Sequence, residues 1–291
     1  MQLTTTQKLY KKRAKIQTNG ARVGVFIFFA IYSVAILLML VWAILASFNE
    51  HTELLVNNQF FPTTFHPENY FKAFETLDAG GVPYFEMVWN SIWFVGARVL
   101  ISMTTITCAA YALGRFHFAG RNVILTTLLV CMMIPTYGTG SSTLIMYNKL
   151  GVYDSPLFVF TSTGIVGTTV FVIMTFFQSM SDTYGEAAKI DGASLSQIFI
   201  KVYVPMVMPS VSAIAVNAFI GGWNDYLTTL YYMPHYPTLS TGLYVYEQAA
   251  KFRMDKPVFF AGVIMCAIPP LILFITFSDK IMTNVTIGGI K

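Results

Sequence analysis

Residues 23 to 48 read VGVFIFFAIYSVAILLMLVWAILASF, a continuous apolar run without a charged side chain. A run of this length can cross a hydrocarbon layer about 30 Å thick, which takes about 20 helical residues. Of the 291 residues in the chain, 55% are apolar and only 11% are charged, whereas soluble domains carry about 25% charged residues. The composition therefore predicts a protein that spans a membrane.

Six segments have the length and apolarity of a membrane span. Four contain no charge, and the other two contain Arg98 and Asp225 respectively. The predicted spans cover residues 23–48, 89–113, 122–148, 155–181, 207–233 and 258–278. A backbone in lipid must satisfy its own hydrogen bonds, and the spans lack the period-two alternation of barrel strands. The expected fold class is therefore an all-α polytopic membrane protein with six transmembrane helices.

The distribution of charge predicts which side each end faces. Basic residues crowd the segment before the first span, and acidic residues dominate the segment after it. Short cytoplasmic segments collect Lys and Arg, so the N and C termini are expected to be cytoplasmic, with Arg115 and Arg121 on the same side. The resulting parts are a basic tail (1–22), a first helix (23–48), an outer loop (49–86), a core of five helices (87–280) and a second cytoplasmic tail (281–291).

Residues 186–209, EAAKIDGASLSQIFIKVYVPMVMP, lie on the cytoplasmic side in this topology. A serine or an aspartate just before the stretch can cap a helix, and Gly192 can break it, because glycine adopts backbone angles that other residues avoid. A second short helix is expected over 194–203, stopped by Pro205 and Pro209. From physics alone, the stretch is either a helical elbow whose small residues let another protein approach, or an ordinary amphipathic connection.

The same stretch resembles the EAA motif of ABC importer permeases. The match consists of E-A-A, three residues, G, nine residues and V-Y-V-P, with an Asp-Gly-Ala turn in the form of the carbohydrate-uptake branch. Valines stand where isoleucine and leucine are usual. Further segments that are similar to the family, in the same order, are PENYFKAF (67–74), AAYALGRFHFAGRN (109–122), GGWNDYL (221–227) and the final IGGIK. The likeness is greatest to the shorter permease subunits of maltose-type sugar importers.

The resemblance implies a type I ABC importer permease fold in a bacterial inner membrane, with coupling helices at 182–204 that sit in a cleft of a separate ATPase. The residues that it assigns to coupling are Glu186, Ala187, Ala188, Asp191, Gly192 and Pro205. The implied partners are a second permease in a heterodimer, two ATPase subunits that bind ATP and magnesium, and an extracellular sugar-binding protein. The implied cargo is a sugar or an oligosaccharide.

Arg98 and Asp225 are the charged residues inside the predicted spans. Charges in a membrane are costly and usually mark a pathway or a partner. At about 1.5 Å of rise per residue, both lie roughly 12 Å below the outer surface. We expect them to pair or to share a polar cavity; the alternatives are separate partners, or an Arg98 side chain that extends outward to water.

Further residues are candidates for the transport route and for docking of the binding protein. Aromatic faces and amides suit sugar rings and hydroxyls, although structural packing is an open alternative for each residue. The route candidates are Asn90, Arg98, Tyr137, Trp223, Asn224, Asp225 and Tyr226. The outer segment 234–256 is long and aromatic, and the matching segment of related transporters reaches into the binding protein; a belt of interfacial tyrosines is the alternative. Its docking candidates are Tyr236, Leu239, Tyr244 and Tyr246.

We find no catalytic or metal-binding arrangement in the sequence, and we expect no cofactor in this chain. The glycine-rich stretch at 137–143 lacks the lysine of a phosphate-binding loop, so ATP hydrolysis must come from other subunits. A stand-alone secondary transporter or channel would show inverted repeats and several intramembrane charges. A membrane enzyme would need His, Asp or Glu clusters within its spans. Copurification with an ATPase separates the importer hypothesis from both.

Overall fold

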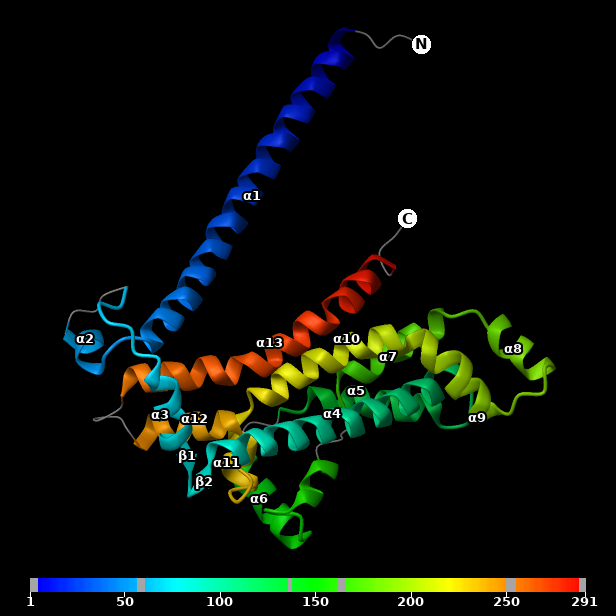
Figure 1. The fold of residues 1–291 in the computed structure, drawn as a ribbon. Coiled ribbons are helices and arrows are strands. Elements are labelled where there is room, and N and C mark those ends of the chain that lie inside the picture. The colour runs from blue at the N-terminus through cyan, green and yellow to red at the C-terminus, as the bar shows by residue number, and fades with distance from the viewer. Residues whose placement is uncertain (1–4, 57–60, 136–137, 162–165, 250–254, 288–291) are drawn as a thin grey trace. The chain divides into compact units, whose positions relative to one another are not determined.

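The computed structural model describes residues 5–56, 61–135, 138–161, 166–249 and 255–287, and it is mainly helical (Figure 1). Its α-helices are α1 (Thr5–Ser47), α2 (His51–Val56), α3 (Glu68–Thr76), α4 (Tyr84–Arg115), α5 (Arg121–Met133), α6 (Gly140–Lys149), α7 (Thr168–Ser179), α8 (Thr183–Ile190), α9 (Leu195–Ile198), α10 (Val204–Trp223), α11 (Tyr226–Tyr232), α12 (Leu239–Ala249) and α13 (Lys256–Ile287). A 3-10 helix, η1 (Pro156–Phe160), and a π-helical turn, η2 (Phe199–Tyr203), accompany them. The strands β1 (Asp78–Ala79) and β2 (Val82–Pro83) pair antiparallel.

The chain forms two compact units, one from parts of residues 1–71 and 255–264 and the other from parts of 72–254 and 265–291. In the first unit, the end of α1 is fixed by Asn69, whose amide donates to the carbonyls of Ser47 and Asn49 at 2.9 Å each. The large apolar side chains along 23–41 are exposed, as expected of a helix that lies in lipid.

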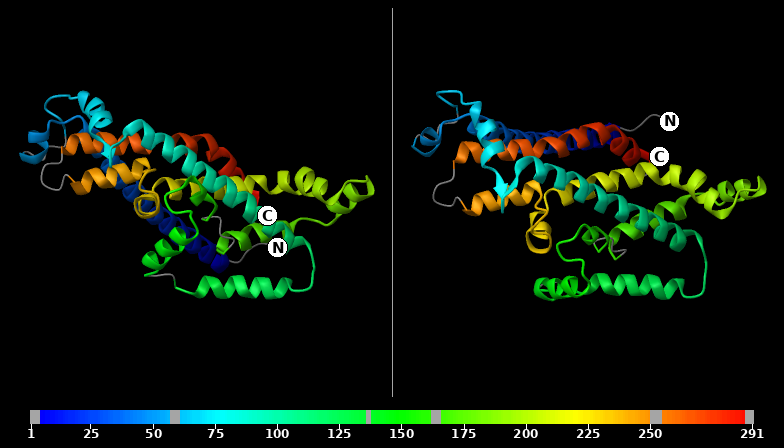
Figure 2. Two further views of the ribbon diagram at one scale, coloured as in Figure 1. Left: turned by 90° about the horizontal axis from the view of Figure 1, so that it is seen from below. Right: turned by 60° about the horizontal axis from the view of Figure 1, so that its bottom comes forward.

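The core of the second unit forms where α4, α7 and α10 pack side by side, as Figures 1 and 2 show. Its buried residues come from all three helices and from the elbow that precedes α10: Met103, Ile106, Ala110, Tyr111, Leu113, Val170, Ile173, Met174, Phe177, Ile198, Tyr203, Val207 and Val211. α4 and α7 approach each other closely at Gly114, where an added Cβ would lie only 3.3 Å from the carbonyl oxygen of Met174. Small residues permit such approaches between membrane helices.

We expect Gly114→Val to destabilise the second unit, because the added methyl groups would push α4 away from α7. Overpacking of this kind costs about 1–3 kcal/mol. Gly96→Val is the matched control: it places the same β-branched residue in the same helix, where no described atom of another element lies within 4 Å of the added Cβ. Thermal unfolding of the detergent-purified chain should fall in temperature for Gly114→Val and not for Gly96→Val; equal falls would contradict this account.

Four of the predicted spans are present as long helices. Among the described residues, the apolar helical segments long enough to cross a membrane are Arg22–Ser47, Tyr84–Arg115, Leu195–Trp223 and Lys256–Thr276. The prediction of continuous helices over 122–148 and 155–181 is wrong. α5 has 13 residues and α7 has 12, which at about 1.5 Å per residue gives roughly 20 Å, short of a hydrocarbon layer of about 30 Å.

Backbone chemistry explains the first interruption and the short helix that precedes the second. Pro135 follows the end of α5, and Gly138 has a φ of +78°, a left-handed angle that ends regular helix. In the next segment, Pro156 opens the short helix η1, and the hydroxyl of Ser155 caps it by accepting from the amide of Leu157 at 3.3 Å. Both sides of each interruption are strongly apolar. The hydropathy pattern therefore predicts one long helix where the structure has two shorter helices.

The predicted helix stop at Pro205 and Pro209 is also wrong, because α9, η2 and α10 follow one another as one helical segment from Leu195 to Trp223. Pro205 lies in the first turn of α10, directly after the π-helical turn η2. Proline lacks an amide hydrogen, and a π turn changes the pairing of the preceding carbonyls. The chain therefore passes Pro205 without ending the helix.

Candidate functional site

The EAA stretch forms an elbow of two short helices, α8 and α9, joined by a tight turn. Gly192 has a φ of +82°, and its amide donates to the carbonyl of Lys189 at 3.1 Å. The next amide, of Ala193, donates to the carbonyl of Ala188 at 3.0 Å. These two bonds form the glycine-dependent Schellman ending of a helix, so the predicted break at Gly192 is confirmed.

The second arm of the elbow begins with a capping box. The hydroxyl of Ser194 accepts from the amide of Gln197 at 3.4 Å, and the side chain of Gln197 accepts from the amide of Ser194 at 2.8 Å. At the start of the first arm, the hydroxyl of Ser181 accepts from the amide of Thr183 at 3.3 Å, whereas the side chain of Asp182 makes no capping bond. Both arms therefore have defined starts, and the angle between them is set locally.

The outer surface of the elbow combines small, apolar and acidic side chains. Glu186 and Ala187 are exposed, and Ala188 is half-buried against the core. Ile190 and Leu195, on either side of the turn, are 86% and 61% exposed. Contiguous exposed apolar patches mark interaction sites, and these two side chains flank one turn, which makes the turn a candidate contact surface.

The remaining coupling candidates lie apart from one another. Asp191 is exposed and caps α8 through its amide, which donates to the carbonyl of Ala187 at 3.0 Å. Pro205 lies beyond η2 in the first turn of α10 and is not part of the turn between α8 and α9. The structure therefore groups five of the six candidates on the elbow and places Pro205 at its junction with the membrane helix.

Sequence reasoning missed the residue that anchors the elbow, since it used Arg115 only to assign topology. Arg115 ends α4 and donates to the carbonyls of Met180 at 3.0 Å and Ser181 at 3.2 Å. It also pairs with Asp182 at 3.0 Å and hydrogen-bonds the hydroxyl of Tyr203. The pattern that could have indicated this role is an arginine at the end of a predicted span, within the family-like stretch AAYALGRFHFAGRN.

The predicted pairing of Arg98 with Asp225 is confirmed, with 3.4 Å between the guanidinium and the carboxylate. Asp225 has a second task, because its carboxylate also accepts from the amide of Thr228 at 3.1 Å and so caps α11. The pair borders a cavity of about 300 Å³ between α4 and α10, lined by Val95, Arg98, Val99, Ser102, Ala218, Gly221, Gly222 and Asp225. An ion pair in such a cavity provides both donors and acceptors for a polar solute.

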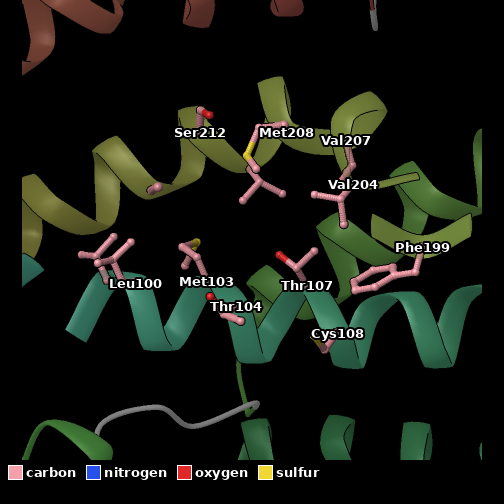
Figure 3. Close-up of a pocket in the computed structure, with 13 residues that line it drawn as sticks. Leu100, Met103, Thr104, Thr107, Cys108, Phe199, Val204, Val207, Met208 and Ser212 are labelled. Carbon is pink, nitrogen blue, oxygen red and sulfur yellow. The ribbon is translucent and has the colours of Figure 1, made fainter. Parts of the chain in front are cut away.

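A second cavity of about 290 Å³ lies along the same seam and shares Val99 with the first. Figure 3 shows Met103 and Thr107 of α4 facing Val204 and Met208 of α10, with Phe199 of η2 at one end. Its lining is mostly apolar, and the hydroxyls of Thr104, Thr107 and Ser212 are interspersed. The two cavities therefore follow one another along the seam between α4 and α10, from the ion pair to Phe199.

The other route candidates have local structural contacts. The indole of Trp223 is buried and donates to the carbonyl of Cys266 at 3.0 Å. The buried amide of Asn90 donates to the carbonyl of Pro237 at 3.2 Å. Further contacts are the amide of Asn224 to the carbonyl of Ile220 at 2.9 Å and the ring of Tyr226 on that of Tyr244 at 4.4 Å. Tyr137 lies outside the described residues.

The docking candidates lie on or just before α12, a helix where the sequence suggested only an aromatic segment. Leu239 is 1% exposed, and its amide donates to the hydroxyl of Ser91 at 2.8 Å. Its side chain is therefore not on a docking surface in this structure. Tyr236, Tyr244 and Tyr246 are half-buried.

Comparison with known proteins identifies relatives along most of the chain. A family model described as binding-protein-dependent transport system inner membrane component matches residues 106–285. The galactooligosaccharides transport system permease protein GanQ of Bacillus subtilis is 28% identical over 272 residues, covering 91% of this chain and 94% of GanQ. The arabinooligosaccharides transport system permease protein AraQ of Halalkalibacterium halodurans is 28% identical over 269 residues, with coverage of 91% and 94%.

Solved structures show the same fold. A chain of a bacterial ABC transporter involved in the import of the acidic polysaccharide alginate has a TM-score of 0.71 at 19% identity, covering 96% of this chain and 99% of that one. A chain of the alginate transporter in complex with its pentasaccharide-bound periplasmic protein has a TM-score of 0.61 at 14% identity, covering 93% of this chain and 96% of that one. The helical membrane architecture is thus that of an ABC importer permease.

Proposed function

Because this chain belongs to the family of binding-protein-dependent transport system inner membrane components, we propose that it is one permease subunit of an ATP-driven importer for a sugar or an oligosaccharide. The names of its relatives support a carbohydrate as the cargo, since GanQ and AraQ are named for two different oligosaccharides. We propose a bacterial inner membrane as its location.

The proposed topology is that of a type I importer, with both termini in the cytoplasm and six crossings, of which the α5–α6 and η1–α7 segments would cross as interrupted helices. The basic N-terminal segment supports this orientation. In the second unit, the elbow and the α11–α12 region lie at opposite ends (Figures 1 and 2). The elbow would then face the cytoplasm, and α12 would face the binding protein outside.

The elbow carries the proposed function. It is a pair of short helices with exposed Ile190 and Leu195 beside small residues, which suits insertion into a cleft of a separate ATPase. Among the described residues, the carboxylate of Glu186 makes no hydrogen bond or ion pair, so it is available to a partner. ATP and magnesium would bind to two such ATPase subunits, and closure of the ATPase pair would move the elbow.

The ion pair of Arg98 and Asp225 would contribute to the route for the cargo. The pair is neutral as a whole and carries several donors and acceptors. It therefore suits the hydroxyls of an uncharged sugar better than it suits a sugar that carries a carboxylate. A lipid-facing position for the cavity is unfavourable, because polar groups in hydrocarbon are costly. The cavity would therefore face the second permease of a heterodimer or the water-filled path between the two.

Uptake measurements in whole cells test the importer hypothesis against a stand-alone transporter. Cells that express the complete gene set should take up radiolabelled galacto-, arabino- or malto-oligosaccharides after an ionophore collapses the proton gradient, provided that ATP is maintained. Depletion of ATP should stop uptake. Uptake that follows the proton gradient and ignores ATP would contradict the proposal.

A further inference from the structure

We propose that Arg115, Tyr203 and Gly185 form a joint that locks the elbow to the ends of α4 and α10, so that a push on the elbow moves these membrane helices instead of bending the connection. The proposal rests on the proposed coupling function of the elbow. It assigns a positioning role to three residues outside the EAA contact surface.

Arg115 connects the end of α4 to the start of the elbow. Its guanidinium donates to the carbonyls of Met180 and Ser181, which directly follow α7, and pairs with Asp182 in front of α8. The side chain is only 10% exposed. A cation at the carbonyl end of a helix is favoured by the helix dipole, and several charge-assisted bonds from one planar group fix its orientation. The first arm of the elbow is therefore tied to α4 as well as to its own chain.

Tyr203 connects the same cation to the second arm. The guanidinium carbon of Arg115 lies 4.5 Å above the Tyr203 ring, and the Tyr203 hydroxyl hydrogen-bonds the same group. Tyr203 is 4% exposed, and its ring also packs on Tyr111 of α4, with 5.5 Å between ring centroids. One tyrosine thus closes the contact between α4 and the segment that leads into α10.

The π-helical turn places Tyr203 in this position. η2 ends at Tyr203, directly before α10. An extra residue in a turn rotates the following side chains relative to a regular helix, and such turns often occur at functional sites. The rotation directs Tyr203 toward α4 and α8, whereas Ile200 of the same turn is 61% exposed.

Gly185 completes the joint because it leaves room for the Tyr203 hydroxyl against α8. A Cβ at position 185 would lie 2.6 Å from the hydroxyl oxygen and 3.4 Å from two ring carbons of Tyr203. A contact of 2.6 Å is too short for a real Cβ. Since burial holds the tyrosine ring on its other faces, the glycine lets α8 lie directly against it.

The joint connects the elbow to α4 and α10 through side chains, in addition to the connection through the backbone. Apart from these contacts, the elbow connects to the membrane helices through residues 180–182, through η2 and through the apolar packing of Ala188 and Ile198 against the core. With them, a displacement of α8 reaches α4 through Arg115 and reaches α10 through Tyr203. Arginine is required for this geometry, because lysine has neither the planar fork nor the stacking face.

The first test compares Arg115→Lys and Tyr203→Phe with Arg121→Lys as the matched control. Arg121 is the first residue of α5, and its guanidinium donates to the carbonyl of Leu113 at 2.7 Å, without a described contact to the elbow. The intact complex, isolated through a tag on this chain, is placed in vesicles with its binding protein. Two quantities are measured: ATP hydrolysed, and uptake of a radiolabelled mixture of galacto-, arabino- and malto-oligosaccharides.

We expect both variants to retain the ATPase subunits and ATP hydrolysis but to take up roughly five- to tenfold less sugar per ATP, in the range typical of coupling between sites. Arg121→Lys should keep the wild-type ratio. A purely structural role would lower the amount of complex and leave this ratio unchanged, so an unchanged ratio in both variants would overturn the joint.

The second test is a double-mutant cycle between Gly185 and Tyr203, which probes the steric contact between them. Gly185→Ala should lower the sugar-to-ATP ratio because its methyl group displaces the Tyr203 hydroxyl. Adding Tyr203→Phe to Gly185→Ala removes the clashing oxygen, so the double variant should perform no worse than Tyr203→Phe alone. Additive losses would contradict the contact. Failure of the wild-type complex to take up any sugar of the mixture, or absence of the ATPase from it, would instead refute the proposed function.

Discussion

Replacing Ala187 with tryptophan should detach the ATPase from the complex while leaving the chain in the membrane. Ala187 is exposed on α8, where its small side chain keeps the helix surface flat. A large ring there would hold the partner away, and loss of about 2 kcal/mol or more in a central contact lowers affinity by more than tenfold. The amount of ATPase that copurifies with the tagged chain measures the effect directly.

His117→Trp is the control for this substitution. His117 is exposed in the connection between α4 and α5, on the same side of the membrane in the proposed topology, and it lies outside the elbow. This variant should retain the ATPase. Equal retention by Ala187→Trp would show that the tip of α8 is not where the ATPase docks.

Removing the positive charge of the intramembrane pair should be the second large effect. Arg98→Met leaves the carboxylate of Asp225 without its cation. The two side chains are 24% and 29% exposed, so the cost lies below the roughly 3–5 kcal/mol of breaking a fully buried pair. We expect the yield of assembled complex and the uptake rate each to fall severalfold. Lys149→Met, which removes an exposed cation from α6, should leave both unchanged.

A second substitution should suppress the effect of Arg98→Met. Asparagine at 225 can still accept the amide of Thr228 and cap α11, so Arg98→Met combined with Asp225→Asn leaves no charge and keeps the cap. The double variant should recover most of the lost yield. Exchange of the two charged residues should not, because an arginine at 225 cannot accept from Thr228. A double variant as poor as Arg98→Met alone would refute the pairing as the cause.

Features that depend on one stretch of chain could be predicted from the sequence. The membrane span at 23–48 can be recognised from the sequence because the hydropathies of its residues sum over one continuous run. The break at Gly192 follows from the conformational freedom of one glycine. The pairing of Arg98 with Asp225 spans 127 positions, yet equal depth in the membrane was enough to expect it.

Features that depend on backbone pairing or on distant contacts could not be predicted. Hydropathy contains no information on the left-handed backbone angle of Gly138. A prediction from hydropathy therefore treats α5 and α6 as one continuous helix. Pro205 indicates a helix end only when the preceding turn is regular, and the π turn η2 changes that condition. The contact of Arg115 with Tyr203 joins residues 88 positions apart, and no local pattern marks either as the other's partner.

The most direct measurement of the coupling elbow is photo-crosslinking from position 184. Tyr184 on α8 is 52% exposed, and a photoreactive phenylalanine analogue replaces its ring with little change in shape. Trp89, which is 62% exposed near the start of α4, provides the control position. Illumination of the intact complex should join position 184, and not position 89, to an ATP-binding polypeptide. An adduct of position 184 with the extracellular binding protein, or an ATPase adduct from position 89 alone, would contradict the account.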